Sequence, residues 1–245
     1  MDLSNLFNLL IAIPAFVAAL TVHEFAHAWA GTRLGDDLAK REGRLTLDPL
    51  KHLDPIGSLV FAIGALSPFG ALIGWAKPVP FNPRNFNNPR RDAMFVALAG
   101  PISNILQVPV WLFLTWLASR LLPGDAARVA LSMMGMDAYD GNRFAPGPLI
   151  IQILMMGVTV NLTIAAFNMI PLPPLDGHWV LEYLGPESVS RFYDSIRPFS
   201  FIILLVLINL PAPFNILRTV IGPIYQFGRQ LVLWAMTQQW FPPGY

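Results

Sequence analysis

A short polar run inside an apolar segment is the first feature of this 245-residue chain that could do chemistry. His23 and His27 lie four positions apart, and Glu24 directly follows the first of them. On a helix, positions i and i+4 share one face about one turn apart, so both imidazoles can bind one Zn²⁺. Glu24 would then be close enough to take a proton from a metal-bound water and pass it to a leaving amine. The H-E-x-x-H spacing therefore predicts a zinc site with a general base, a set of groups suited to hydrolysis.

The position of these three residues in the chain supports the same interpretation. They follow a long apolar run, FNLLIAIPAFVAALTV, near the start of the sequence. Titratable groups at membrane depth are costly, and they are usually retained because they act there. A simpler explanation is that polar side chains reach out of the membrane at a helix end, but it does not explain why all three occur together.

A catalytic zinc site usually takes three protein ligands and leaves one position open, so a third ligand must come from elsewhere. The chain has no cysteine, and its only other histidines are His52 and His178. Asp176 stands out among the carboxylates because it follows a proline-rich stretch at the end of an apolar segment. The prolines favour a rigid extended backbone, and Gly177 allows a close backbone approach. A simpler role for Asp176, as the N-cap of a short helix over residues 177–184, stays open.

The composition indicates a membrane protein. Hydrophobic residues make up 54% of the chain and charged residues 13%, whereas soluble domains carry about 25% charged residues. We therefore expect an all-α polytopic membrane protein, one domain over 1–245 with a core over 5–180 and C-terminal helices over 198–240. The net charge of +1 gives no general attraction to nucleic acid, which we do not expect as a partner. About five or six transmembrane or re-entrant segments are expected, at 6–30, 58–75, 92–122, 149–170 and 199–221, with an amphipathic tail at 224–241 that either spans or lies in the interface.

The segment at 58–75 is long enough to span, but glycines and a proline interrupt it. Nine of the sixteen Lys and Arg residues lie between positions 31 and 91, on both sides of this segment. Because cytoplasmic loops are rich in basic residues, a segment that dips in and returns would keep both flanks cytoplasmic. We favour this re-entrant interpretation over a full crossing. It places the histidine pair near the cytoplasmic face, and it allows a small membrane-embedded β-hairpin or loop that ends in KPVPF and could bind an unwound substrate as an added strand.

Several stretches of the chain together resemble the site-2 protease family of intramembrane zinc metalloproteases. They are the H-E-x-x-H run, LAGPISN at 98–104 and NMIPLPPLDG at 168–177. The stretches GRLTLDPLKHLDPIGSL and GWAKPVPFNPRNF resemble the small prokaryotic branch, which carries no PDZ or CBS domain. One departure is Asp48, where an asparagine is expected for this branch.

The resemblance implies a role for individual residues and a class of partner. Asn168 would bind the substrate backbone or stabilise the oxyanion, and Asn104 would be a structural or substrate contact. The implied partners are the lipid bilayer and membrane proteins whose transmembrane segments contain helix-destabilising residues. The implied location is a prokaryotic inner membrane, with the active site toward the cytoplasm. The implied ligands of one Zn²⁺ are His23, His27 and Asp176, and Glu24 is the implied general base and acid.

Two other functions remain possible from the residues alone: a membrane zinc transporter, and a catalytically inactive scaffold that binds membrane proteins. The other apolar segments contain few titratable groups, which argues against a transport pathway. Of the remaining histidines, His178 is expected to be structural. His52 is expected to be a loop residue, with a supporting role beside Asp48 or Asp54 as the alternative.

Overall fold

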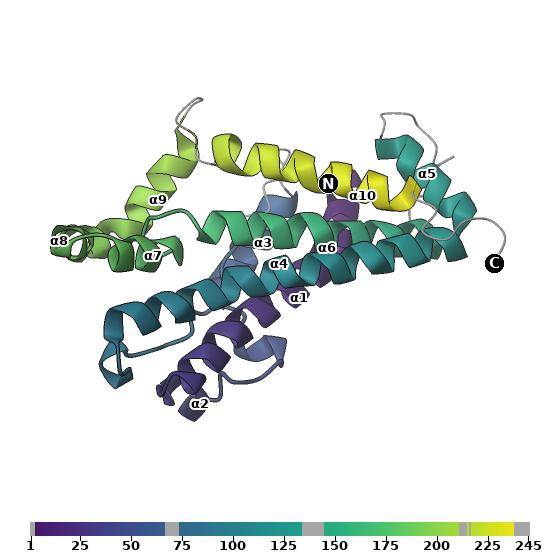
Figure 1. The fold of residues 1–245 in the computed structure, drawn as a ribbon. Helices are drawn as coiled ribbons and strands as arrows, with labels where there is room; N and C mark the ends of the chain where they lie inside the picture. The colour runs from purple at the N-terminus through teal and green to yellow at the C-terminus, as the bar shows by residue number, and fades with distance from the viewer. Residues whose placement is uncertain (1–2, 67–73, 134–144, 211–214, 216, 238–245) are drawn as a thin grey trace.

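Three long helices make up the centre of the fold in the computed structural model (Figure 1). They are α1 (Leu3–Arg33), α4 (Pro89–Leu121) and α6 (Pro146–Asn168), and each contacts the other two. α4 and α6 lie side by side along their lengths, while α1 crosses them (Figure 1). The described part of the chain is helical and contains no strand, which confirms the expected all-α class. The structure describes residues 3–66, 74–133, 145–210, 215 and 217–237.

Small side chains on α1 allow the three helices to approach closely. Ala12, Ala15 and Ala19 are fully buried, and the last two form an apolar cluster with Val160 of α6. Their spacing of three and four residues places them on one face of α1. In a membrane, where lipid is as apolar as leucine, close packing of small residues is a main source of helix association. This alanine face therefore fixes α1, and with it the histidine pair, against its neighbours.

Four helical stretches of the described chain are long and apolar enough to cross a membrane. Their outer faces carry large apolar side chains, such as Leu106 and Phe113 of α4, which are 68% and 53% exposed. The expected count of five or six segments is not confirmed. α10 (Gly222–Thr237) has only 16 residues and packs along α6 (Figure 1), and the last part of the expected tail lies outside the described residues. The four stretches are Leu9–Arg33, Pro89–Leu121, Pro146–Asn168 and Glu187–Asn209.

The two flanks of the segment expected at 58–75 lie next to each other. It begins as α3 (Pro55–Leu66), and residues 67–73 lie outside the described part. On its return, Ala76 forms an isolated antiparallel bridge with Leu53, and the amide of Lys77 donates to the carbonyl of His52 at 2.8 Å. Two flanks that pair in this way suit a re-entrant segment. Of the expected β-hairpin, the described residues show this single bridge and no strand.

Two buried charged residues hold the loops on either side of α3 together. Asp36 accepts hydrogen bonds from the amide of Asn82 at 2.6 Å and from the side chain of Asn85 at 2.7 Å. Arg44 donates to the carbonyl of Pro78 at 3.0 Å and to that of Lys77. These bonds hold the chain that follows residues 58–75 against the loop that follows α1.

The shorter elements complete the fold around the three long helices. α7 follows α6 and packs on α4, and α8 and α9 continue from α7. α5 contacts both α4 and α6 at the opposite end of these two helices (Figure 1). Their bounds are α2 (Leu38–Arg41), η1 (Pro49–Lys51), η2 (Pro83–Asn85), α5 (Pro123–Met133), α7 (Gly177–Leu184), α8 (Glu187–Ile196), η3 (Arg197–Phe199), α9 (Ser200–Asn209) and the π-helical η4 (Leu217–Ile221).

Candidate metal centre

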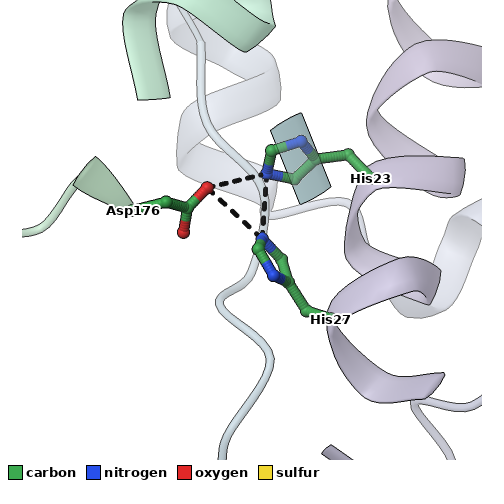
Figure 2. Close-up of side chains that lie close together, drawn as sticks. All are labelled: His23, His27 and Asp176. Atoms are coloured by element: carbon green, nitrogen blue, oxygen red, sulfur yellow. Dashed lines mark hydrogen bonds and ion pairs between the residues drawn. The ribbon is translucent and has the colours of Figure 1, made fainter. Parts of the chain in front are cut away.

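Three side chains that are far apart in the sequence meet at one point (Figure 2). His23 and His27 project from successive turns of α1, and Asp176 reaches them from the turn that precedes α7. The Nε2 atoms of the two histidines lie 3.0 Å apart. Oδ2 of Asp176 lies 3.3 Å from Nε2 of His23 and 3.4 Å from Nε2 of His27. Both histidines are buried and Asp176 is partly buried, so the group is largely shielded from its surroundings.

The hydrogen bonds on the far side of each imidazole decide which nitrogen faces this point. Nδ1 of His27 donates to the backbone carbonyl of Val96 at 2.7 Å, and Nδ1 of His23 bonds to Oδ1 of Asn104 at 2.6 Å. A neutral imidazole carries one N–H and one lone pair, so both Nε2 atoms present lone pairs to each other and to Asp176. Oδ2 of Asp176 is buried and has no hydrogen-bond partner within the described residues. Such a set of acceptors requires a cation.

The dimensions of the group fit zinc. Zinc binds imidazole nitrogen and carboxylate oxygen at about 2.0–2.2 Å, and two ligand atoms of a tetrahedral site are then about 3.4 Å apart. The three ligand atoms form a triangle with edges of 3.0, 3.3 and 3.4 Å. Two histidines and one carboxylate leave the fourth position for water or substrate, as in catalytic rather than structural zinc sites.

The carboxyl group of Asp176 is ionised even without zinc. Burial raises its pKa, but the positive charge of a protonated His27 and the hydrogen bonds that protonated His23 and His27 donate lower it by more, so the pKa of Asp176 lies below its usual range. Although Asp176 is the N-cap residue of α7, its side chain makes no capping hydrogen bond. The carboxylate points toward the histidines instead (Figure 2), so the simpler role as a helix cap is not observed.

The turn that carries Asp176 is held at both ends. The hydroxyl of Tyr193 donates to the carbonyl of Pro171 at 2.9 Å, and Leu175 packs with Ile170 and Leu204 in an apolar cluster. Gly177 lets the chain fold back on the end of α6, because a Cβ there would lie 2.7 Å from the carbonyl oxygen of Ile170. At the other end of α7, Arg90 of α4 donates to the carbonyl of Gly185 at 2.9 Å and to that of Glu182.

α4 contributes no ligand, but it borders the metal position. Gly100 faces the imidazoles so closely that a Cβ at this position would lie 2.6 Å from Nε2 of His23 and closer still to Nε2 of His27. Gly100 belongs to the LAGPISN stretch noted in the sequence, but nothing in its spacing indicated that it faces the histidine pair. The backbone carbonyl of Val96 was also missed, because a carbonyl acceptor requires no particular residue type.

The other expected site residues are not among the three potential metal ligands. Glu24 follows His23 on α1 and is largely buried. Asn168 ends α6, where its side-chain amide donates to the carbonyl of Ile164 at 3.0 Å. Asn104 is fully buried against His23, which favours a structural contact over a substrate contact.

Neither remaining histidine belongs to the group of potential ligands found in the described residues. Nδ1 of His178 donates to the carbonyl of Leu175 at 2.6 Å, and its ring packs against Tyr193, which suits the structural role expected for it. His52 is fully buried rather than a simple loop residue, and its Nε2 bonds to the carbonyl of Thr46 at 2.8 Å.

Comparison with known proteins agrees with this geometry. Residues 11–208 match the family model of Peptidase family M50. The chain is 34% identical over 221 residues to "Putative zinc metalloprotease YwhC" of Bacillus subtilis (strain 168), covering 90% of this chain and 88% of that protein. It is 28% identical over 204 residues to "Putative zinc metalloprotease Rip2" of Mycolicibacterium smegmatis, covering 83% and 68%. No solved structure matches the chain at a significant level.

The match to the family model covers most of the chain, and it includes the two helix turns and the proline-rich stretch that form the metal centre. The names of the relatives favour a protease over the transporter and the inactive scaffold that the sequence left open. This chain therefore belongs to Peptidase family M50, the site-2 protease family, and is a zinc metalloprotease of membranes.

Proposed function

We propose that the protein hydrolyses peptide bonds in or near the transmembrane segments of other membrane proteins, with His23, His27 and Asp176 as the zinc ligands. One observation carries the proposal: three acceptor atoms converge at 3.0–3.4 Å while both Nδ1 atoms of the histidines are occupied elsewhere. The ligand helix α1 is itself long and apolar enough to cross a membrane, which supports a reaction at membrane depth.

Zinc held by His23, His27 and Asp176 would supply Lewis acidity and would lower the pKa of a nearby water toward neutrality. Glu24 would accept a proton from the water that attacks the scissile carbonyl, and it would later deliver that proton to the leaving amine. Glu24 is suited to this because it lies on α1 directly beside a ligand and is largely buried. Asn168, at the end of α6 and close in sequence to the Asp176 turn, would donate from its amide to the substrate carbonyl or backbone.

The substrate must present an extended backbone, because the carbonyl groups of an intact helix are hydrogen-bonded within it. We expect substrates with helix-destabilising residues in their transmembrane segments for this reason. Residues 77–81 follow the proposed re-entrant segment without regular secondary structure, Arg44 bonds to two of their carbonyls, and they are candidates to bind the unwound chain along their edge.

The proposed orientation places the active site toward the cytoplasm of a prokaryotic cell, in its inner membrane. The loops rich in Lys and Arg adjoin the C-terminal end of α1, the half that carries His23 and His27. Basic loops are preferentially retained in the cytoplasm. A short path from the cytoplasm would supply the water that hydrolysis requires.

The proposal is tested by expressing the protein with a single-span membrane substrate and comparing Glu24→Gln, Asp176→Asn and a control. Glu24→Gln should keep zinc but lose cleavage by about 10²-fold or more, because the general base is gone. Asp176→Asn should lose zinc and cleavage together. Glu42→Gln, at an exposed position, is the matched control and should cleave normally. If cleavage continues at the normal rate in both site variants, the proposed mechanism is wrong.

A further inference from the structure

A chain of buried amides runs behind the metal centre and joins α1, α4 and α6. Asn104 of α4 bonds through Oδ1 to His23, and its Nδ2 donates to Oδ1 of Asn161 at 2.8 Å and to the carbonyl of Ala19 at 3.2 Å. Nδ2 of Asn161, on α6, donates in turn to the carbonyl of Gly157 at 2.8 Å. We propose that Asn161 is a positioning residue that acts through Asn104 to keep the metal-binding lone pair of His23 directed at zinc. This inference rests on the zinc ligands proposed above.

The direction of every hydrogen bond in this chain is fixed by backbone carbonyls, which can only accept. The side-chain atom of Asn161 next to the carbonyl of Gly157 must be its NH₂ group, so its oxygen faces Asn104. The group of Asn104 that lies between this oxygen and the carbonyl of Ala19 must likewise be NH₂. Oδ1 of Asn104 is therefore the atom that faces His23.

The consequence for His23 is a fixed tautomer. Since Oδ1 of Asn104 only accepts, Nδ1 of His23 must carry a proton, and in the neutral imidazole that binds a metal Nε2 then carries the lone pair that faces Asp176. His27 is fixed in the same way, but directly by the carbonyl of Val96. The tautomer of His27 thus depends on a backbone carbonyl. The tautomer of His23 depends instead on the side-chain amides of Asn104 and Asn161, each of which can rotate by half a turn.

Burial makes this dependence strong. Asn104 and Asn161 are both 0% exposed, inside helices that cross the membrane, so neither can replace a lost partner with water. Without the oxygen of Asn161, the NH₂ group of Asn104 keeps only the longer bond to Ala19. The orientation of Asn104 in which its oxygen and NH₂ group have exchanged places then becomes similar in free energy to the original one. It would donate to Nδ1 of His23 and move the imidazole proton to Nε2, where the metal binds.

The test measures zinc affinity by chelator competition on the purified full chain in detergent. Asn161→Leu should weaken zinc binding by about 10-fold, at the lower end of the range for groups that orient a metal ligand. Asn161→Asp should bind nearly as wild type, because a carboxylic acid kept neutral by burial can still accept from Asn104 and donate to Gly157. The matched control is Thr115→Val on α4, which removes another fully buried hydrogen bond, to the carbonyl of Trp111 at 2.8 Å.

Equal zinc affinity in Asn161→Leu and Thr115→Val would overturn the proposal. Equal losses of zinc affinity in Asn161→Leu and Asn161→Asp would also overturn it, because they would indicate a packing effect. A second measurement needs no variant. ¹⁵N NMR of the four histidines in the zinc-free wild type should show a proton on Nδ1 of His23, and an Nδ1 without a proton would refute the argument. If the wild type itself binds no zinc or cleaves nothing, the proposed function fails instead, and the two failures are therefore distinguishable.

Discussion

Gly100 of α4 faces the Nε2 atoms of both histidines, and Gly100→Ala therefore tests the geometry of the site directly. The added Cβ would lie 2.6 Å from Nε2 of His23, whereas ordinary contacts of a Cβ begin at 3.4 Å. Either α4 or the imidazole must therefore retreat by about 0.8 Å, which exceeds the tolerance of about 0.2 Å in metal–ligand distances. The imidazoles can therefore fit beside Ala at position 100 only by turning away from the metal position.

The expected size of the effect follows from the cost of overpacking. Forcing a methyl group into a filled site costs about 1–3 kcal/mol, which corresponds to zinc binding that is about 5- to 150-fold weaker. The zinc-free protein should be affected much less, since its imidazoles can rotate. In addition, alanine favours a helix over glycine by about 1 kcal/mol. We therefore expect Gly100→Ala to lower zinc affinity without lowering the thermal stability of the zinc-free form.

The assay is chelator competition for zinc, with thermal unfolding of the zinc-free protein measured in parallel. Gly31→Ala is the matched control, because it adds the same methyl group to a helix of the same region but finds no atom nearer than 3.9 Å. If Gly100→Ala binds zinc within about twofold of this control, α4 does not border the metal and the position assigned to zinc is wrong.

Three further predictions concern the parts that hold the site. Asp36→Ala should lower the free energy of unfolding by about 2–4 kcal/mol, because three donors lose a buried, charged acceptor; comparing its thermal unfolding with that of exposed Asp37→Ala checks this, and equal stability of the two variants would contradict it. Tyr193→Phe should weaken zinc binding by about fivefold, because the turn that carries Asp176 loses one hydrogen bond that contributes about 1 kcal/mol. The control Tyr225→Phe, at an exposed position, should not change zinc binding. Removing zinc by chelation should destabilise the wild type by about 2.7 kcal/mol relative to zinc at a hundredfold excess over Kd, whereas Asp176→Asn should show no such difference.

The sequence predicted the parts of the site that depend on residue type and local spacing. His23 and His27 were predictable because four residues make one helical turn, and Asp176 because prolines end the preceding helix at the membrane boundary. The role of Gly100 was not predictable, since its effect depends on how closely α4 packs on α1. Hydropathy alone could not give the number of crossings, because it does not show that α10 is only 16 residues long, or that the flanks of α3 pair with each other.

α4 sets the geometry of the metal centre although it supplies no ligand. On one side it holds the histidines, through the carbonyl of Val96, the side chain of Asn104 and the close approach at Gly100. On the other side it packs against α7 and, through Arg90, holds the end of the helix that Asp176 begins. The distance between the α1 ligands and Asp176 is thus fixed by the way both elements pack on one helix. It follows that substitutions along the inner face of α4 should alter zinc affinity even where no ligand is touched, whereas those on its lipid face, such as at Leu106, should not.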